Sequence, residues 1–157
     1  MGLDLLPRTC PCPKHGALTA PEGLTHAEDA TCPFDTDDFP KRMLGTCCSI
    51  DGKTISRELE ALGEHELADR VYADMTHEEA LAFAQELRDA VERLERAHGS
   101  KKRKPKGAGF NGHFDRDKRG VVWSKYSTFE EALAAIRQAI AWYEKTSTLG
   151  FGVDAWA

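Results

Sequence analysis

Two capping boxes, each followed by a long apolar stripe, constrain the fold of this chain more than any other feature. In residues 76–79 (Thr-His-Glu-Glu) and 127–130 (Ser-Thr-Phe-Glu), a hydroxyl residue stands three positions before a glutamate, so each side chain can bond the other's backbone N–H. The apolar residues that follow recur at intervals of three and four, which predicts two long helices, each with one buried face. They are Ala80, Leu81, Phe83, Ala84, Leu87, Val91 and Leu94 in the first helix and Phe129, Leu133, Ile136, Ile140 and Tyr143 in the second. His77 and His98, at the two ends of the first helix, are expected to be exposed and not catalytic.

Shorter patterns lie on either side of these helices. Ile55, Leu59 and Leu62 predict a helix that opens at Gly52 and ends at Gly63. Leu67, Val71 and Met75 predict one further short helix. Residues 110–114 and 121–126 predict a β-hairpin around a polar turn, and the alternation in 149–156 predicts a third strand.

The expected fold is therefore α+β. A loop-rich metal-binding segment (1–52) precedes a helical hairpin (53–99) and a basic linker (100–109), and a small ββαβ unit (110–157) packs with the helices. A chain of 157 residues fits one domain and can bury a core. Whether the helical part and the ββαβ unit share that core is open.

The composition favours a cytoplasmic chain that does not enter a membrane. With 41% apolar and 30% charged residues, it has no apolar run of membrane-spanning length. Its first residues, Met-Gly-Leu-Asp-Leu-Leu-Pro-Arg, offer neither the basic start nor the apolar run of a secretory signal.

All five cysteines lie between Cys10 and Cys48, in a part of the chain whose prolines prevent a long helix. In a reducing compartment such clusters are metal ligands more often than disulfides, and an odd number of cysteines fits full disulfide pairing poorly. A metal site is the sharpest chemical prediction from the sequence.

One half of that site is defined by Cys12-Pro-Lys-His15-Gly16, where two ligands three residues apart on a tight turn can reach one ion. This stretch resembles the Cys-Pro-x-Cys-Gly zinc knuckle of ribbon and treble-clef modules, with His15 as the second ligand. The second half is expected from Cys32 and either Cys47 or Cys48, although Asp35 stands where a second knuckle would place its other cysteine. A structural zinc is the first expectation; an iron–sulfur cluster, disulfides and buried thiols are the alternatives. The candidate ligands are Cys10, Cys12, His15, Cys32, Cys47 and Cys48.

Positive charge is concentrated in residues 100–126, where nine basic and two acidic residues give +7 in a chain of net charge −5. Such a segment suits a polyanion, and the aromatic residues of the hairpin could stack on bases. A solvated linker beside a core hairpin is the alternative. A hairpin followed by a capped helix also resembles the sheet-and-helix DNA-binding units of integrase arms and plant-type AP2 domains. The candidate nucleic-acid contacts are Lys101, Lys102, Arg103, Lys104, Lys106, Arg116, Lys118, Arg119 and Lys125.

Motifs of catalysis are absent or out of context. Gly52-Lys53-Thr54 would need a glycine at position 47 to complete a phosphate-binding loop, and the G-x-G-x-x-G of residues 107–112 follows a basic linker where a dinucleotide site would follow a strand. Neither HExxH nor a nucleophile elbow occurs. The expected function is a non-enzymatic, zinc-stabilised small binding protein that contacts nucleic acid. The alternative is a protein-interaction or structural subunit of a larger complex or virus particle, with the metal loop as a staple.

Overall fold

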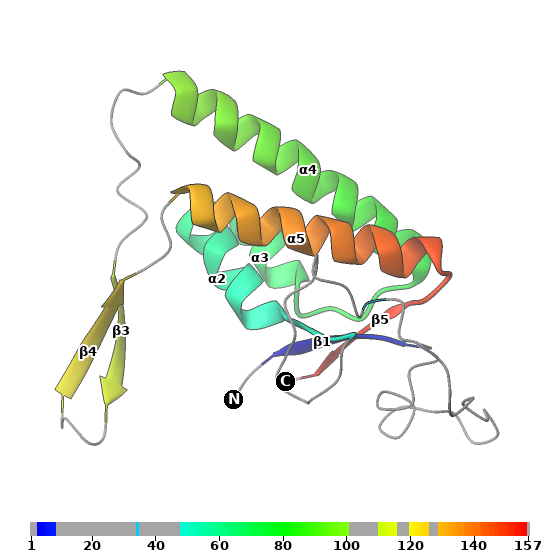
Figure 1. Ribbon diagram of the computed structural model, residues 1–157, viewed down its shortest axis with the longest axis horizontal. Coiled ribbons are helices and arrows are strands. Elements are labelled where there is room, and N and C mark those ends of the chain that lie inside the picture. Colours follow the sequence, from blue (N-terminus) through cyan, green and yellow to red (C-terminus); the bar gives the residue numbers. More distant parts are fainter. Residues whose placement is uncertain are drawn as a thin grey trace.

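A three-stranded antiparallel sheet brings together segments from opposite ends of the sequence. In the computed structural model, which describes residues 3–8, 34, 48–100, 110–115, 120–125 and 129–156, β1 (Asp4–Pro7) lies between β2 (Ile50–Asp51) and β5 (Val153–Trp156) (Figure 1). Leu5 of β1 is opposite Ile50 on one side and Ala155 on the other. The sheet therefore ties residues more than 140 positions apart into one ladder, as Asp4 pairs with Trp156.

The helices of the described residues lie on one side of this sheet (Figure 1). They are α2 (Gly52–Ala61), α3 (His65–Arg70), α4 (His77–Ser100) and α5 (Phe129–Thr148). The two long helices run antiparallel and side by side, since Arg88 and Arg137 form ion pairs with Glu144 and Glu95 of the facing helix. Helices α4 and α5 confirm the two long amphipathic helices expected from the sequence.

The local signals at the helix ends are confirmed where the structure describes them. At the start of α4, the Glu79 N–H donates to the Thr76 hydroxyl at 3.2 Å, and the Thr76 N–H donates to the Glu79 carboxylate at 2.8 Å. Gly63 follows α2 with φ of +85°, a conformation that glycine adopts without strain. The capping box at residues 127–130 lies partly outside the described residues.

The apolar faces of these elements form a single core. Leu5 of β1, Leu59 of α2, Leu87 of α4, Ile136 of α5 and Val153 of β5 are all fully buried in one cluster. Helices α2, α3 and α4 thus share a core with α5 and β5, two of the elements of the predicted ββαβ unit. The predicted stripes of α4 and α5 are buried, apart from two residues of α4. Leu94 is half-buried. The prediction that Leu81 belongs to the buried face is wrong: its side chain is 53% exposed because it lies one position off the stripe.

Two features of the fold differ from the prediction. The short helix α3 ends before Val71, and Met75 instead forms a β-bridge with Val153. Strand β1 lies in the segment that was expected to be loop-rich, where no strand was specifically predicted. Its side chains do not alternate between apolar and polar because both faces are covered: Leu5 and Leu6 point to opposite sides, and both have no exposed surface.

The predicted order strand, strand, helix, strand is confirmed after residue 110, but its pairing is not that of one unit. Strands β3 (Phe110–Asp115) and β4 (Gly120–Lys125) form the expected hairpin. Strand β5 pairs with β1, so within the described chain the hairpin is a separate two-stranded sheet. The α+β class is confirmed, while the division of the chain at residues 52, 99 and 109 stays a prediction.

Of the helices in the described ranges, none combines the length and the apolar character needed to cross a bilayer.

Candidate functional site

The predicted metal ligands lie almost entirely outside the described residues. This holds for Cys10, Cys12, His15, Cys32 and Cys47. Cys48 is described, and it is fully buried in the hydrophobic core cluster. Within the described ranges, no three His, Cys, Asp or Glu side chains gather closely enough to hold a metal ion.

Trp142 of α5 anchors two points of the cysteine-rich segment. Its indole N–H donates to the backbone carbonyl of Cys48 at 2.8 Å. The ring of Phe34 lies 6.0 Å from the Trp142 ring, centroid to centroid, and all three residues are fully buried. Phe34 lies two positions after Cys32, and Cys48 lies one position after Cys47. Both therefore contact the same side chain, that of Trp142.

Sequence reasoning missed Trp142 because it considered one stripe of α5 only. A second line of small or buried residues runs beside the first at spacings of seven, three and four. Its members are Ala132, Ala139, Trp142 and Thr146, all fully or almost fully buried. Two adjacent buried lines indicate a helix covered on two sides, and this pattern would have identified Trp142 as a core residue.

The hairpin carries one predicted nucleic-acid contact inside the described residues. Lys125 of β4 is paired with Phe110 of β3. The other eight basic candidates lie outside the described residues: Lys101, Lys102, Arg103, Lys104, Lys106, Arg116, Lys118 and Arg119.

The hairpin register also indicates which aromatic positions share a face of the hairpin. Directly opposite residues share a face of an antiparallel pair, and the faces alternate along each strand. The pairs Phe110–Lys125, Gly112–Trp123 and Phe114–Val121 therefore occupy one face of the hairpin. That face combines three aromatic positions with a lysine.

The arginines of the helical body are largely committed to ion pairs with acidic residues. Arg70 pairs with Glu86 and Arg93 with Glu64, besides the two pairs that join α4 to α5. These pairs are solvent-exposed and contribute little to stability, but they neutralise the guanidinium charge locally. With residues 100–126 at +7 and the whole chain at −5, the rest of the chain carries −12. The net charge of residues 100–126 is thus opposite in sign to that of the rest of the chain.

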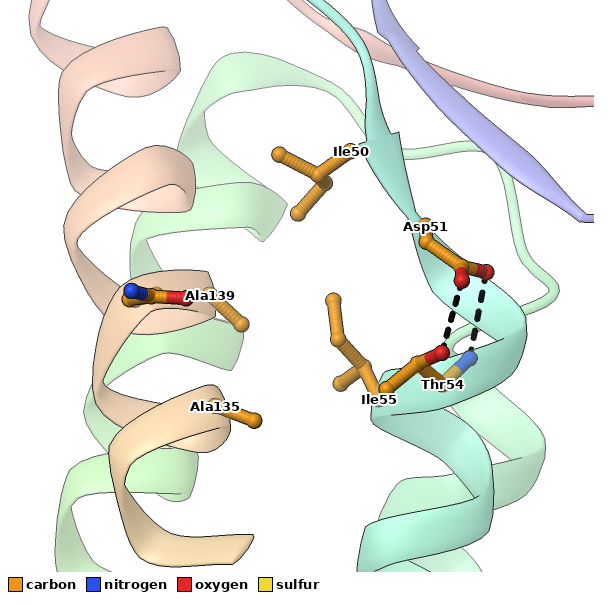
Figure 2. A pocket seen from close by; sticks show the side chains of 7 residues that line it. Ile50, Asp51, Thr54, Ile55, Ala135 and Ala139 are labelled. Carbon is orange, nitrogen blue, oxygen red and sulfur yellow. Dashed lines mark hydrogen bonds between the residues drawn. The ribbon is translucent and has the colours of Figure 1, made fainter. Parts of the chain in front are cut away.

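A small cavity lies between α2 and α5. It measures about 70 Å³ and is lined by Ile50, Ile55, Ala135, Gln138 and Ala139 together with Asp51 and Thr54. Figure 2 shows the Thr54 hydroxyl and N–H both directed at the Asp51 carboxylate, to which they donate at 2.6 and 3.2 Å. Asp51 is the N-cap of α2. The cavity is far below the size of a metabolite pocket, and its carboxylate serves the helix end.

Two further titratable residues are packed against neighbouring parts of the fold. Burial raises the pKa of the Tyr143 hydroxyl far above its ordinary value, against a smaller lowering by Arg70, so Tyr143 stays protonated. His98 was expected to be exposed at the end of α4, but it is half-buried, because its ring stacks on Phe129 at 4.0 Å between centroids. His77, at the other end, is exposed as expected.

In comparisons with known proteins, the chain matches no family model, no curated protein and no solved structure.

Proposed function

We propose that this chain is a non-enzymatic binding protein that contacts nucleic acid through its basic hairpin and linker and that a zinc ion stabilises its cysteine-rich segment. The observation that carries the proposal is the hairpin register, which gathers Phe110, Phe114, Trp123 and Lys125 on one face of β3–β4. Aromatic rings and cationic side chains on one surface are the combination that nucleic-acid-binding proteins use for bases and phosphates.

The charge distribution supports the same surface. Residues 100–126 carry +7, and they lie in the sequence between two helices whose arginines are paired with carboxylates. Because the field of the remaining chain is negative, a polyanion that approaches the protein is oriented toward the hairpin. The second candidate, a protein-interaction or assembly subunit, has no comparable observation in its favour and is an outcome of the tests below.

The zinc proposal is supported by the anchoring at Trp142. Consecutive Cα atoms are about 3.8 Å apart, so Cys32 lies within about 7 Å of Phe34 and Cys47 within about 4 Å of Cys48. Phe34 and Cys48 both contact Trp142. Phe34 and Cys48, from distant points of the sequence, thus meet at one side chain. The proposal is that Cys32 and Cys47, their near neighbours in the chain, complete a tetrahedral site with Cys12 and His15. The burial of Cys48 among core residues favours Cys47 as the fourth ligand.

Elemental analysis of the purified protein, with its ultraviolet–visible spectrum, tests the metal. We expect one zinc per chain and no visible absorbance, because zinc has a filled d shell. Cys12→Ser and Cys32→Ser should each release the ion, because a four-ligand site loses most of its affinity for the metal when one ligand is removed. His77→Asn, at an exposed histidine outside the candidate ligands, is the control and should keep the ion. A chain without stoichiometric metal, whose unfolding midpoint is unaffected by a chelator, would contradict the proposal; a brown protein that contains iron would replace zinc by a cluster.

Neutralising the basic linker tests the nucleic-acid contact. Replacing the four residues 101–104 (Lys-Lys-Arg-Lys) by glutamine should weaken binding at least tenfold at low salt and lower the slope of log K against log salt by about 3. The measurement is fluorescence anisotropy of a labelled oligonucleotide over a range of salt concentrations. Arg57→Gln combined with Lys145→Gln, both in the helical body, is the control and should leave the slope unchanged. Unaltered binding in the linker variant would reduce the segment to a connector, and a partner bound independently of salt would favour the protein-interaction function.

A further inference from the structure

We propose that the hairpin binds single-stranded nucleic acid in preference to duplex, by stacking unpaired bases on the aromatic face of β3–β4. This inference rests on the proposed function and adds the class of ligand to it. The aromatic face is defined by the pairs Phe110–Lys125, Gly112–Trp123 and Phe114–Val121.

The two faces of the hairpin differ in chemistry. The opposite face carries the pairs Asn111–Ser124, His113–Val122 and Asp115–Gly120, which are mainly polar. The phenylalanine and tryptophan positions of the two strands thus fall on the same face, although each strand contains both aromatic and polar residues. Successive pairs on that face are about 7 Å apart along the strands, so the aromatic positions form a row rather than a single point.

Gly112 occupies the middle of this row on β3. It stands directly opposite Trp123 in the register of the hairpin. Glycine in a strand weakens pairing and commonly marks a place where a ligand comes close to the backbone. At this pair, the row combines a glycine position on one strand with the Trp123 position on the other.

A row of aromatic positions favours single strands because of what each nucleic acid exposes. In a duplex the faces of the bases are covered by their neighbours, and proteins read base edges with polar side chains. In a single strand the faces are accessible, and stacking on aromatic rings stabilises binding with little dependence on sequence. The face offers aromatic positions, while the basic residues of the same stretch of sequence, 100–126, can neutralise the backbone phosphates.

Charge complementarity also favours nucleic acid over a protein as the occupant of this face. The cores of protein–protein interfaces are depleted in lysine and in charge generally. Here Lys125 belongs to the aromatic face itself, and residues 100–126 carry +7. Such an excess of one sign matches a polyanion.

The test compares oligothymidine, oligouridine and a mixed-sequence DNA duplex of equal length by fluorescence anisotropy at one salt concentration. We expect tighter binding of both single strands than of the duplex. Trp123→Leu should weaken single-strand binding about 5- to 150-fold, the range that loss of one stacked base implies, and leave the duplex unchanged. Trp123→Phe, which keeps an aromatic ring, should retain most of the affinity. Val122→Ala, on the opposite face, is the matched control and should behave as wild type.

Tryptophan fluorescence gives a second readout that does not depend on a Trp123→Leu protein that folds. Single strands should quench the emission of the wild-type protein but not that of Trp123→Phe, which retains Trp142 and Trp156. Equal affinity for single strands and duplex, an unaffected Trp123→Leu variant, or equal quenching in both proteins would overturn the stacking inference while leaving an electrostatic nucleic-acid-binding function in place. Failure to bind any of the three ligands would overturn the proposed function, and the inference with it.

Discussion

Replacement of Trp142 by alanine is expected to lower the free energy of unfolding by about 4–8 kcal/mol. Removing a fully buried tryptophan side chain costs about 3–5 kcal/mol through lost burial and the cavity that remains. The substitution also removes the N–H that donates to the Cys48 carbonyl, and a buried carbonyl left without a donor costs a further 1–3 kcal/mol or so. Because this cost is comparable to the total stability of an ordinary domain, the variant should be largely unfolded.

Urea denaturation of two further variants separates the parts of this effect. Trp142→Phe keeps most of the ring volume and should lose only the hydrogen bond and some packing, at a cost of about 1–3 kcal/mol. Trp156→Ala is the control, because Trp156 is 46% exposed, and it should change stability by less than about 1 kcal/mol. A Trp142→Ala protein as stable as the Trp156→Ala protein would show that the anchoring of Phe34 and Cys48 contributes nothing to the fold. If the zinc proposal is correct, Trp142→Phe should also weaken zinc retention against a competing chelator.

Val153→Asp is expected to prevent folding altogether. Val153 has no exposed surface, and its backbone N–H and carbonyl are both bonded to Met75, at 2.7 and 2.9 Å. These bonds fix the residue between β1 and the chain before α4, so its side chain has no way to turn toward solvent. A carboxylate held in the apolar core either stays charged at a cost of several kcal/mol or must bind a proton at neutral pH, which is also unfavourable.

Circular dichroism and size-exclusion chromatography would reveal this loss as reduced helix content and an increased hydrodynamic radius. Trp156→Asp introduces the same charge into the same strand at an exposed position and should fold normally. A folded Val153→Asp protein with native helix content would mean that β5 is dispensable and that the helices form the core without the sheet.

The helices were predictable because their signals are local. Thr76 and Glu79 are three residues apart and bond each other, as their spacing indicates. The stripe of α4 needs only its own sequence to be recognised. The sheet was not predictable in the same way, because β1 gains its partners from positions near 50 and 155. No pattern within four residues can name partners so far away, and a strand buried on both faces lacks the alternation that identifies one.

The candidate site, too, was predictable where its signals are local and not where they depend on distant contacts. The hairpin was predicted from alternation and a polar turn, and its register then follows from simple pairing of two adjacent strands. The packing of Cys48 against α5 depends on a contact between residues 48 and 142, which the cysteine spacing alone does not indicate. Spacing names residues able to bind a metal, whereas only the packed chain places them.

The stacked rings of His98 and Phe129 have a consequence for how this chain can vary. They lie at the last turn of α4 and the first turn of α5, so the chain leaves the helical body and rejoins it at nearly the same point. In the order of the chain, the hairpin and its basic flanks are an insertion between two helices that pack against each other. Since the cost of closing a loop grows only slowly with its length, this insert can be lengthened, shortened or exchanged while the body keeps its fold. The chain thus separates a stable support from an exchangeable insert.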